Sequence, residues 1–182
     1  VVNTFTYGDI NIDLDETPTP DDDDNPDTNE YEMIPGEEIT KDPKVTVNTD
    51  SKASWLFVKL VKSDNFDDFM EYEIADGWFP LTDDQGNIVT GVYFREQTEV
   101  TGEDVVIEVI KDNKVRVKET VTKEMLNALD PEGVDATYPT LTVTAYAVQR
   151  SGFEPAISEG ATAPTAEQVL AAAFAAWNVI EA

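Results

Sequence analysis

Apolar and polar residues alternate or run together in a pattern that predicts a chain made mostly of β-strands. Val45 and Val47 alternate with polar neighbours, which is the pattern of a strand with one buried face. After a polar bend over residues 48–54, the segment 55–61 is almost continuously apolar, and such a run indicates a strand covered on both faces. Two strands of this kind around a short polar bend are typical of the start of a β-sandwich.

At the start of the chain, the apolar positions change parity at Gly8. From Val1 to Tyr7 they fall at odd numbers, and from Ile10 to Leu14 they fall at even numbers. A strand of period two cannot change its buried face without a bulge or a break. Two interpretations stay open: one strand with a bulge at Gly8, or two strands that belong to different sheets.

Further apolar segments predict the remaining strands and two helices. The strands are expected over residues 66–74, 78–81, 88–94, 105–110, 115–121 and 141–148. The polar run KDNK at 111–114 predicts a hairpin between the strands on either side of it. A short helix is expected over Thr122–Leu129, with Thr122 as its N-cap and Pro131 just beyond its end.

A longer helix is expected over Thr165–Ile180, because TAEQ at 165–168 is a capping box. Its apolar residues form one stripe, which we expect to dock on the sandwich: Val169, Ala173, Ala176, Trp177 and Ile180. The large aromatic residues are interpreted as core, with a carbohydrate-stacking surface as the alternative: Trp55, Phe57, Trp78, Phe79, Tyr93, Phe94 and Trp177.

Together these elements predict a mostly β fold, a jelly-roll-type β-sandwich with a short mid-chain helix and a C-terminal helix. A chain of 182 residues is long enough for one domain with a substantial core and too short for two comfortable ones, so we expect a single domain over 1–182. Within it we distinguish an N-terminal arm (1–7), an acidic loop (17–32) and the C-terminal helix (165–180).

The charge of the chain excludes several classes of partner. There are 38 acidic and 12 basic residues, for a formal net charge of −26. Nucleic acids and anionic membranes bind basic patches, so neither is expected as a partner. No apolar run approaches the roughly 20 residues needed to span a bilayer. The absence of cysteine excludes disulfides and thiol chemistry.

The absence of histidine removes the usual catalytic arrangements. Without an imidazole there is no HExxH zinc motif and no Ser-His-Asp or Cys-His centre. A pair of carboxylates is uninformative among 38 acids, although two of them can perform glycoside hydrolysis. We therefore expect a protein that is not an enzyme, with a secreted hydrolase as the least favoured class.

The acidic loop contains a candidate cation site. Prolines and four consecutive aspartates oppose regular structure there. Its oxygen donors match positions 1, 3, 5, 7, 9 and 12 of a calcium-binding EF-hand loop: Asp21, Asp23, Asn25, Asp27, Asn29 and Glu32. Pro26 stands at the sixth position, where an EF-hand has glycine, and no helices flank the loop. No cofactor is required, and three readings stay open: a solvated loop, an ordered Ca²⁺ site, or weak diffuse cation binding.

Four blocks of sequence, taken in order, resemble a known family. They are NTFTYGDINIDLDE, PGEEITKDPKVTVNT, SWLFVKL and LTVTAYAVQRSGF, and together they are similar to the TasA/camelysin-like secreted proteins of Gram-positive bacteria. Members of that family carry a signal peptide processed by a SipW-type peptidase. The short aromatic-containing stretch that usually precedes the first block is missing here. The chain also offers no imidazole and no thiolate for the zinc of the metalloprotease activity ascribed to camelysin-like proteins.

The resemblance implies a structural subunit of an extracellular filament or biofilm-matrix fibre, secreted or held at the cell surface. Its partners would be further copies of itself, and other matrix proteins. The uncharged arm before Gly8 is what donor-strand complementation requires, with Gly8 as the hinge. The arm comprises Val1, Val2, Asn3, Thr4, Phe5, Thr6 and Tyr7. Such a head-to-tail contact propagates into a filament. The alternative is a monomeric secreted module that binds calcium or carbohydrate.

Overall fold

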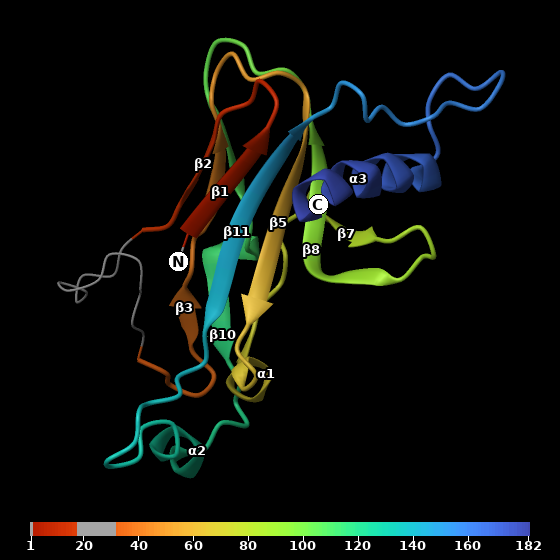
Figure 1. Ribbon diagram of the computed structural model, residues 1–182. Coiled ribbons are helices and arrows are strands. Elements are labelled where there is room, and N and C mark those ends of the chain that lie inside the picture. The colour runs from red at the N-terminus through yellow and green to blue at the C-terminus, as the bar shows by residue number, and fades with distance from the viewer. Residues whose placement is uncertain (1, 18–31) are drawn as a thin grey trace.

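A computed structural model describes residues 2–17 and 32–182 of the chain, which form three β-sheets, short helices and a C-terminal helix (Figure 1). The largest sheet, sheet A, has the order β1 (Val2–Tyr7), β11 (Leu141–Gln149), β5 (Ser54–Lys62), β8 (Ile88–Gln97), β7 (Phe79–Thr82). Sheet B has the order β2 (Ile12–Asp15), β4 (Lys44–Val47), β9 (Val105–Glu108). Sheet C has the order β3 (Glu38–Thr40), β10 (Lys114–Val117), β6 (Met70–Glu71).

The helices are short except for the last one. They are α1 (Phe66–Phe69), α2 (Lys123–Asn127) and α3 (Ala166–Glu181), with a 3₁₀ turn at Lys111–Asn113. The Thr122 hydroxyl accepts a hydrogen bond from the Met125 N–H, as expected of an N-cap. The mostly β fold, the short mid-chain helix and the C-terminal helix are therefore confirmed.

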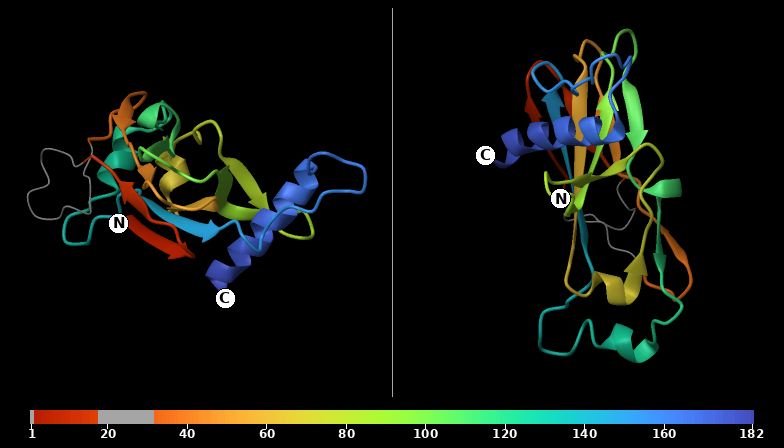
Figure 2. Two further views of the ribbon diagram at one scale, coloured as in Figure 1. Left: turned by 90° about the horizontal axis from the view of Figure 1, so that it is seen from above. Right: turned by 90° about the vertical axis from the view of Figure 1, so that its right-hand side faces the viewer.

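Strand β5 is covered on both faces. Leu56 and Val58 pack into the core that sheet A shares with sheets B and C. Trp55 and Phe57 point to the opposite face, into the core beneath α3. Figure 2 shows α3 crossing sheet A on the side away from most of the other strands. The continuously apolar segment thus sits between two layers of side chains, as its pattern predicted.

The capping box of α3 and the docking of its stripe are both confirmed. The Thr165 hydroxyl accepts from the Gln168 N–H at 3.2 Å, and the Gln168 side chain accepts from the Thr165 N–H at 2.8 Å. Trp177 is 3% exposed and meets the ring of Phe57 with centroids 5.3 Å apart. Ala173 and Ala176 are buried beside it, whereas Val169 and Ile180 are half-buried. The helix completes the core on this face of sheet A.

The predicted hairpin around residues 111–114 is wrong. Asp112 and Asn113 both adopt φ of 55°, so the local turn does form. The strands on either side nevertheless pair elsewhere: β9 pairs with β4, and β10 pairs with β3 and β6. Turn chemistry reverses the chain, but burial of each strand against a distant partner decides which sheet it joins.

Two aromatic assignments are also wrong. The stretch expected as a strand over 66–74 begins with α1, because Phe66 and Phe69 are buried three residues apart on one side of a helical turn. Phe79, expected in the core, is 58% exposed on the edge strand β7. Of the remaining aromatic residues of that set, Tyr93 is half-buried and the others are buried.

Candidate assembly interface

The N-terminal arm forms an edge strand of its own domain. Strand β1 runs parallel to β11 and places Phe5 opposite Tyr146 (Figure 1). Among the described strands, none pairs with its other edge. The arm is thus paired in cis in the single chain, and its pairing with a neighbour stays a prediction.

Strand β1 displays two large aromatic side chains at the surface. Phe5 is 55% exposed and Tyr7 is 58% exposed. Phe5 stacks on Tyr146, which in turn meets Trp177 edge to face at 5.1 Å. An exposed ring supported by a continuous path of rings into the core is a preformed apolar contact surface.

Gly8 is the point where the chain passes from sheet A to sheet B, so the second interpretation of the parity change is confirmed. Strand β1 belongs to sheet A and β2 to sheet B. Gly8 has a φ of 106°, and a Cβ there would lie 2.5 Å from the Cβ of Gln149. The Gln149 side chain also accepts a hydrogen bond from the Asp9 N–H at 3.1 Å. Glycine is required at position 8 because its φ is positive and because a Cβ would collide with Gln149. Its use as a hinge stays a prediction.

The candidate calcium ligands lie almost entirely outside the described residues. Of the six, only Glu32 is described, and it is exposed. Asp21, Asp23, Asn25, Asp27 and Asn29 belong to the segment that the structure does not describe. Among residues 2–17 and 32–182, no group of three or more acidic side chains is arranged to hold a metal ion. Calcium binding stays a prediction.

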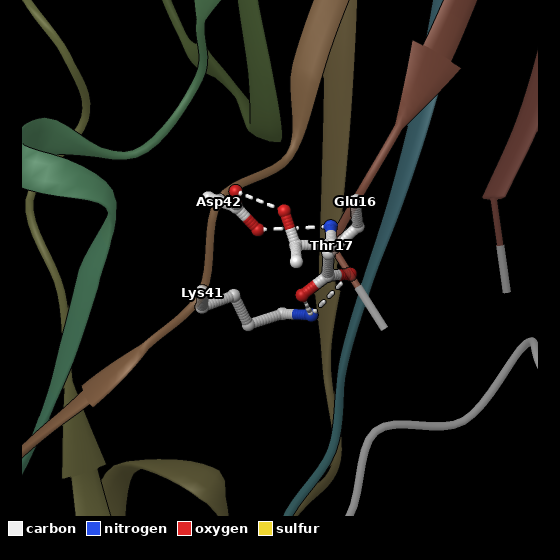
Figure 3. Close-up of polar contacts among 4 residues, drawn as sticks. All are labelled: Glu16, Thr17, Lys41 and Asp42. Atoms are coloured by element: carbon white, nitrogen blue, oxygen red, sulfur yellow. Dashed lines mark hydrogen bonds and ion pairs between the residues drawn. The ribbon is translucent and has the colours of Figure 1, made fainter. Parts of the chain in front are cut away.

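A polar network holds the chain where the acidic segment begins (Figure 3). Lys41 Nζ donates to both carboxylate oxygens of Glu16, at 2.8 and 2.9 Å. Thr17 donates its N–H to one oxygen of Asp42 at 3.0 Å and its hydroxyl to the other at 2.7 Å. Burial acts to raise the pKa of Asp42. The two hydrogen bonds from Thr17 and the ammonium of Lys44 outweigh burial and hold that pKa below its ordinary value. The network fixes Glu16 and Thr17 against the segment that leads into β4.

A groove of about 390 Å³ lies between β8 and β9, and our sequence reasoning missed it. Its lining includes the whole of β9 together with Asp76, Arg95, Lys111 and Asp112. Burial lowers the pKa of Arg95, whose guanidinium lies 5.6 Å from the ring centroid of Trp78. The sequence offered one signal for this groove, because Arg95 is a basic residue within a largely apolar strand of a very acidic chain.

None of the helices in the described ranges is long and apolar enough to cross a membrane.

Comparison of the chain with models of protein families found no match, and searches of curated proteins and of solved structures found none either. The resemblance to the TasA/camelysin-like proteins therefore rests on the four sequence blocks alone.

Proposed function

We propose that this protein is a structural subunit of an extracellular filament of the TasA/camelysin-like type, secreted by a Gram-positive bacterium. Copies would join head to tail, with β1 of one subunit adding as a strand to a sheet of the next. The jelly-roll arrangement of the sandwich belongs to the same proposal. The observation that carries it is that β1 is an uncharged edge strand with two exposed aromatic rings, on a chain of net charge −26.

Edge strands with open hydrogen-bonding groups are sites of strand addition, and soluble proteins ordinarily protect them with charges, proline or bulges. Strand β1, with the sequence VNTFTY, has none of these protections. Phe5 is 55% exposed, so burying the rest of its ring in a contact would contribute roughly half of the value for a whole side chain, about 1–1.5 kcal/mol. The neighbour's receiving edge is a different surface from β1, so the contact does not close on itself and repeats into a filament.

Charge supports the same strand as the point of contact. Two subunits that each carry −26 repel one another, and an acidic contact surface would add to that repulsion. Strand β1 can approach a second copy without bringing a carboxylate of its own.

Deleting residues 1–7 is the direct experiment. We expect filaments of the intact chain in negative-stain microscopy and a pelletable fraction on ultracentrifugation, and we expect both to be lost on deletion. Phe5→Asp should have nearly the same effect. Thr4→Ala is the control within the same strand, because Thr4 is also exposed but lies on the opposite face of β1, and the change removes no ring and adds no charge. Filaments that form equally well without the arm would contradict the proposal.

A monomeric carbohydrate-binding module is the second candidate, favoured by the exposed stacked ring of Phe5 on Tyr146. Aromatic faces of this kind stack against sugar rings. In that case the intact chain would remain monomeric, and Phe5→Ala would weaken its retention on purified cell-wall polysaccharide.

A further inference from the structure

Arg95 is held in a fixed position at the groove between β8 and β9. Its guanidinium lies 5.6 Å from the ring centroid of Trp78. It also packs against the backbone of Gly77, where an added Cβ would lie 3.2 Å from one terminal guanidinium nitrogen. A planar guanidinium held between a ring and a backbone turn has little freedom left to lose when it binds a ligand.

The hydrogen-bonding capacity of Arg95 is unused. Its Nε is buried and has no hydrogen-bond partner, and no ion pair among the described residues includes its guanidinium. Burial lowers the pKa of Arg95, and no nearby carboxylate counters that effect, although the chain holds 38 acids. A buried donor without an acceptor is costly, so a ligand that supplies oxygen acceptors here is favoured.

Two carboxylates that line the same groove are also unpaired with the residues that the structure describes. Asp76 lies in the turn before Trp78, and Asp112 lies in the 3₁₀ turn at Lys111–Asn113. The nearby ammonium of Lys111 donates its hydrogen bond to Glu73 instead, at 2.9 Å. That bond is the main cause that raises the pKa of Lys111, and the charges of Asp76 and Asp112 add to it. Both aspartates are exposed and keep their capacity to accept hydrogen bonds.

The third acid of the groove is already engaged. The carboxylate of Glu108 accepts a hydrogen bond from the side-chain amide of Asn113 at 2.8 Å. Its carbonyl accepts one from the indole N–H of Trp78, also at 2.8 Å. The groups left for a ligand are therefore one guanidinium, from Arg95, and two carboxylates.

This combination of charges selects the chemistry of a ligand. A guanidinium offers two parallel N–H donors to a carboxylate. A ligand with a carboxylate alone would be attracted by Arg95 and repelled by the two aspartates, and a ligand with an ammonium alone would meet the reverse. A molecule that carries both groups is attracted by all three side chains. The groove volume of about 390 Å³ lies at the small end of the range for ligand sites.

We propose that this groove binds a small zwitterion, an amino acid or a molecule of similar size with one carboxylate and one ammonium group. The carboxylate accepts hydrogen bonds from Arg95, and the ammonium lies against Asp76 and Asp112. The site uses no residue of β1, so it is a binding activity beyond the proposed filament function and independent of it.

The test follows the indole N–H signals of freshly refolded full chain in ¹H–¹⁵N correlation spectra, at low and constant ionic strength. Trp78 is the reporter, because Arg95 lies near its ring and its indole bonds to the groove residue Glu108. Its signal is assigned by its loss in Trp78→Phe. Trp55 and Trp177 are internal controls, because both lie in the separate core beneath α3.

The probes are glycine, β-alanine and γ-aminobutyrate, which carry the two charged groups at three spacings. Acetate and ethylammonium carry one group each. We expect at least one zwitterion to shift the Trp78 signal and to leave those of Trp55 and Trp177 unchanged. It should bind about threefold to fivefold more tightly than acetate, the contribution of exposed charge pairs. It should bind at least about tenfold more tightly than ethylammonium, which has no group for Arg95.

Two sets of variants test the two ends of the ligand. Arg95→Gln should weaken binding of the zwitterion at least about tenfold. Arg116→Gln is its control, since Arg116 is exposed on β10 and does not line the groove. Asp76→Asn combined with Asp112→Asn should remove the preference for the zwitterion over acetate without weakening acetate. Asp84→Asn, in an exposed turn outside the groove, should leave the preference unchanged.

Three results would each overturn the inference: no shift of the Trp78 signal with any of the zwitterions, acetate that binds as tightly as the best of them, or unchanged affinity in Arg95→Gln. If Arg95→Gln fails to fold, the double aspartate variant decides, because both of its positions are exposed. A preference for the zwitterion that survives in that variant also overturns the inference.

Discussion

The ring of Phe5 stacks on the ring of Tyr146 across the β1–β11 pair, with centroids 5.3 Å apart and planes inclined by 17°. Tyr146 lies on the face of sheet A that α3 covers, where it meets Trp177. The exposed ring of the edge strand is therefore connected to the buried core by one intermediate ring. The assembly surface and the docking of the C-terminal helix share this aromatic path.

Replacing Trp177 with alanine should cost about 3–5 kcal/mol of unfolding free energy, because it leaves a cavity between α3 and Phe57. Urea denaturation followed by far-UV circular dichroism measures the loss. Asn178→Ala is the control, since Asn178 is exposed on the same helix, and its effect should stay within about 0.5 kcal/mol. A loss below about 1 kcal/mol for Trp177→Ala would mean that the ring does not hold the helix.

Asp42→Asn should lower the stability at pH 7 by about 1.5–3 kcal/mol, because the charged acceptor of two bonds from Thr17 is lost. The lowered pKa of Asp42 means that its carboxylate stabilises the fold above the unfolded value of about 3.9. That contribution is lost as the pH falls through the folded pKa. The difference between wild type and variant should therefore shrink below about pH 4.

The measurement is the urea midpoint of both proteins at pH 7 and at pH 3. Asp84→Asn, in the exposed turn after β7, serves as the control at both values. A difference that stays constant from pH 7 to pH 3 would show that ionisation of Asp42 is not the source of its effect.

Gly91→Ala should destabilise the fold more than Gly86→Ala. Both glycines have positive φ, 73° and 83°, so both variants bear the cost of roughly 1–2 kcal/mol for a left-handed residue. A Cβ at Gly91 would also lie 2.3 Å from the Leu60 carbonyl oxygen, whereas one at Gly86 would contact nothing within 4 Å. The close approach of β8 to the backbone of β5 at Gly91 therefore leaves no room for a side chain. Equal unfolding free energies for the two variants would contradict it.

Assembly should be slow at low ionic strength and faster with salt, with divalent cations or below about pH 5. Subunits of charge −26 repel one another, and the Debye length falls from about 30 Å at 0.01 M salt to about 8 Å at 0.15 M. Near pH 5, carboxylates of ordinary pKa begin to take up protons. Light-scattering kinetics of freshly refolded subunits tests this, and fastest assembly in salt-free buffer at pH 8 would rule out repulsion as the brake.

Millimolar Ca²⁺ should protect the segment from Asp21 to Glu32 against proteolysis if its oxygen donors bind the ion. The measurement is limited proteolysis with and without calcium, together with calorimetry. Asp21→Asn combined with Asp23→Asn should remove the protection. NaCl at the same ionic strength is the control for screening of charge. No heat and no change in cleavage would leave the reading of a solvated loop.

Local patterns predicted the elements whose residues determine them directly. The capping box at Thr165–Gln168, the N-cap at Thr122 and the covered strand after the bend at 48–54 are all present. The parity change at Gly8 indicated a break, and the structure resolved it as a passage between two sheets. These features depend on backbone hydrogen bonding and side-chain periodicity over a few residues.

Which strand each strand pairs with, and the groove that Arg95 lines, depended on contacts between distant parts of the chain. No local signal could place β9 beside β4 rather than β10, because burial of Ile107 depends on residues about 60 positions away. Likewise, Arg95 is an ordinary strand residue until β8, β9 and the loop at Trp78 enclose its guanidinium. By itself the sequence determined most of the strands, the two capped helices and the buried face of most elements, but not α1 or the exposed side of Phe79. The tertiary structure decided which edges stay open, because an edge is defined only when every other strand has found its partner.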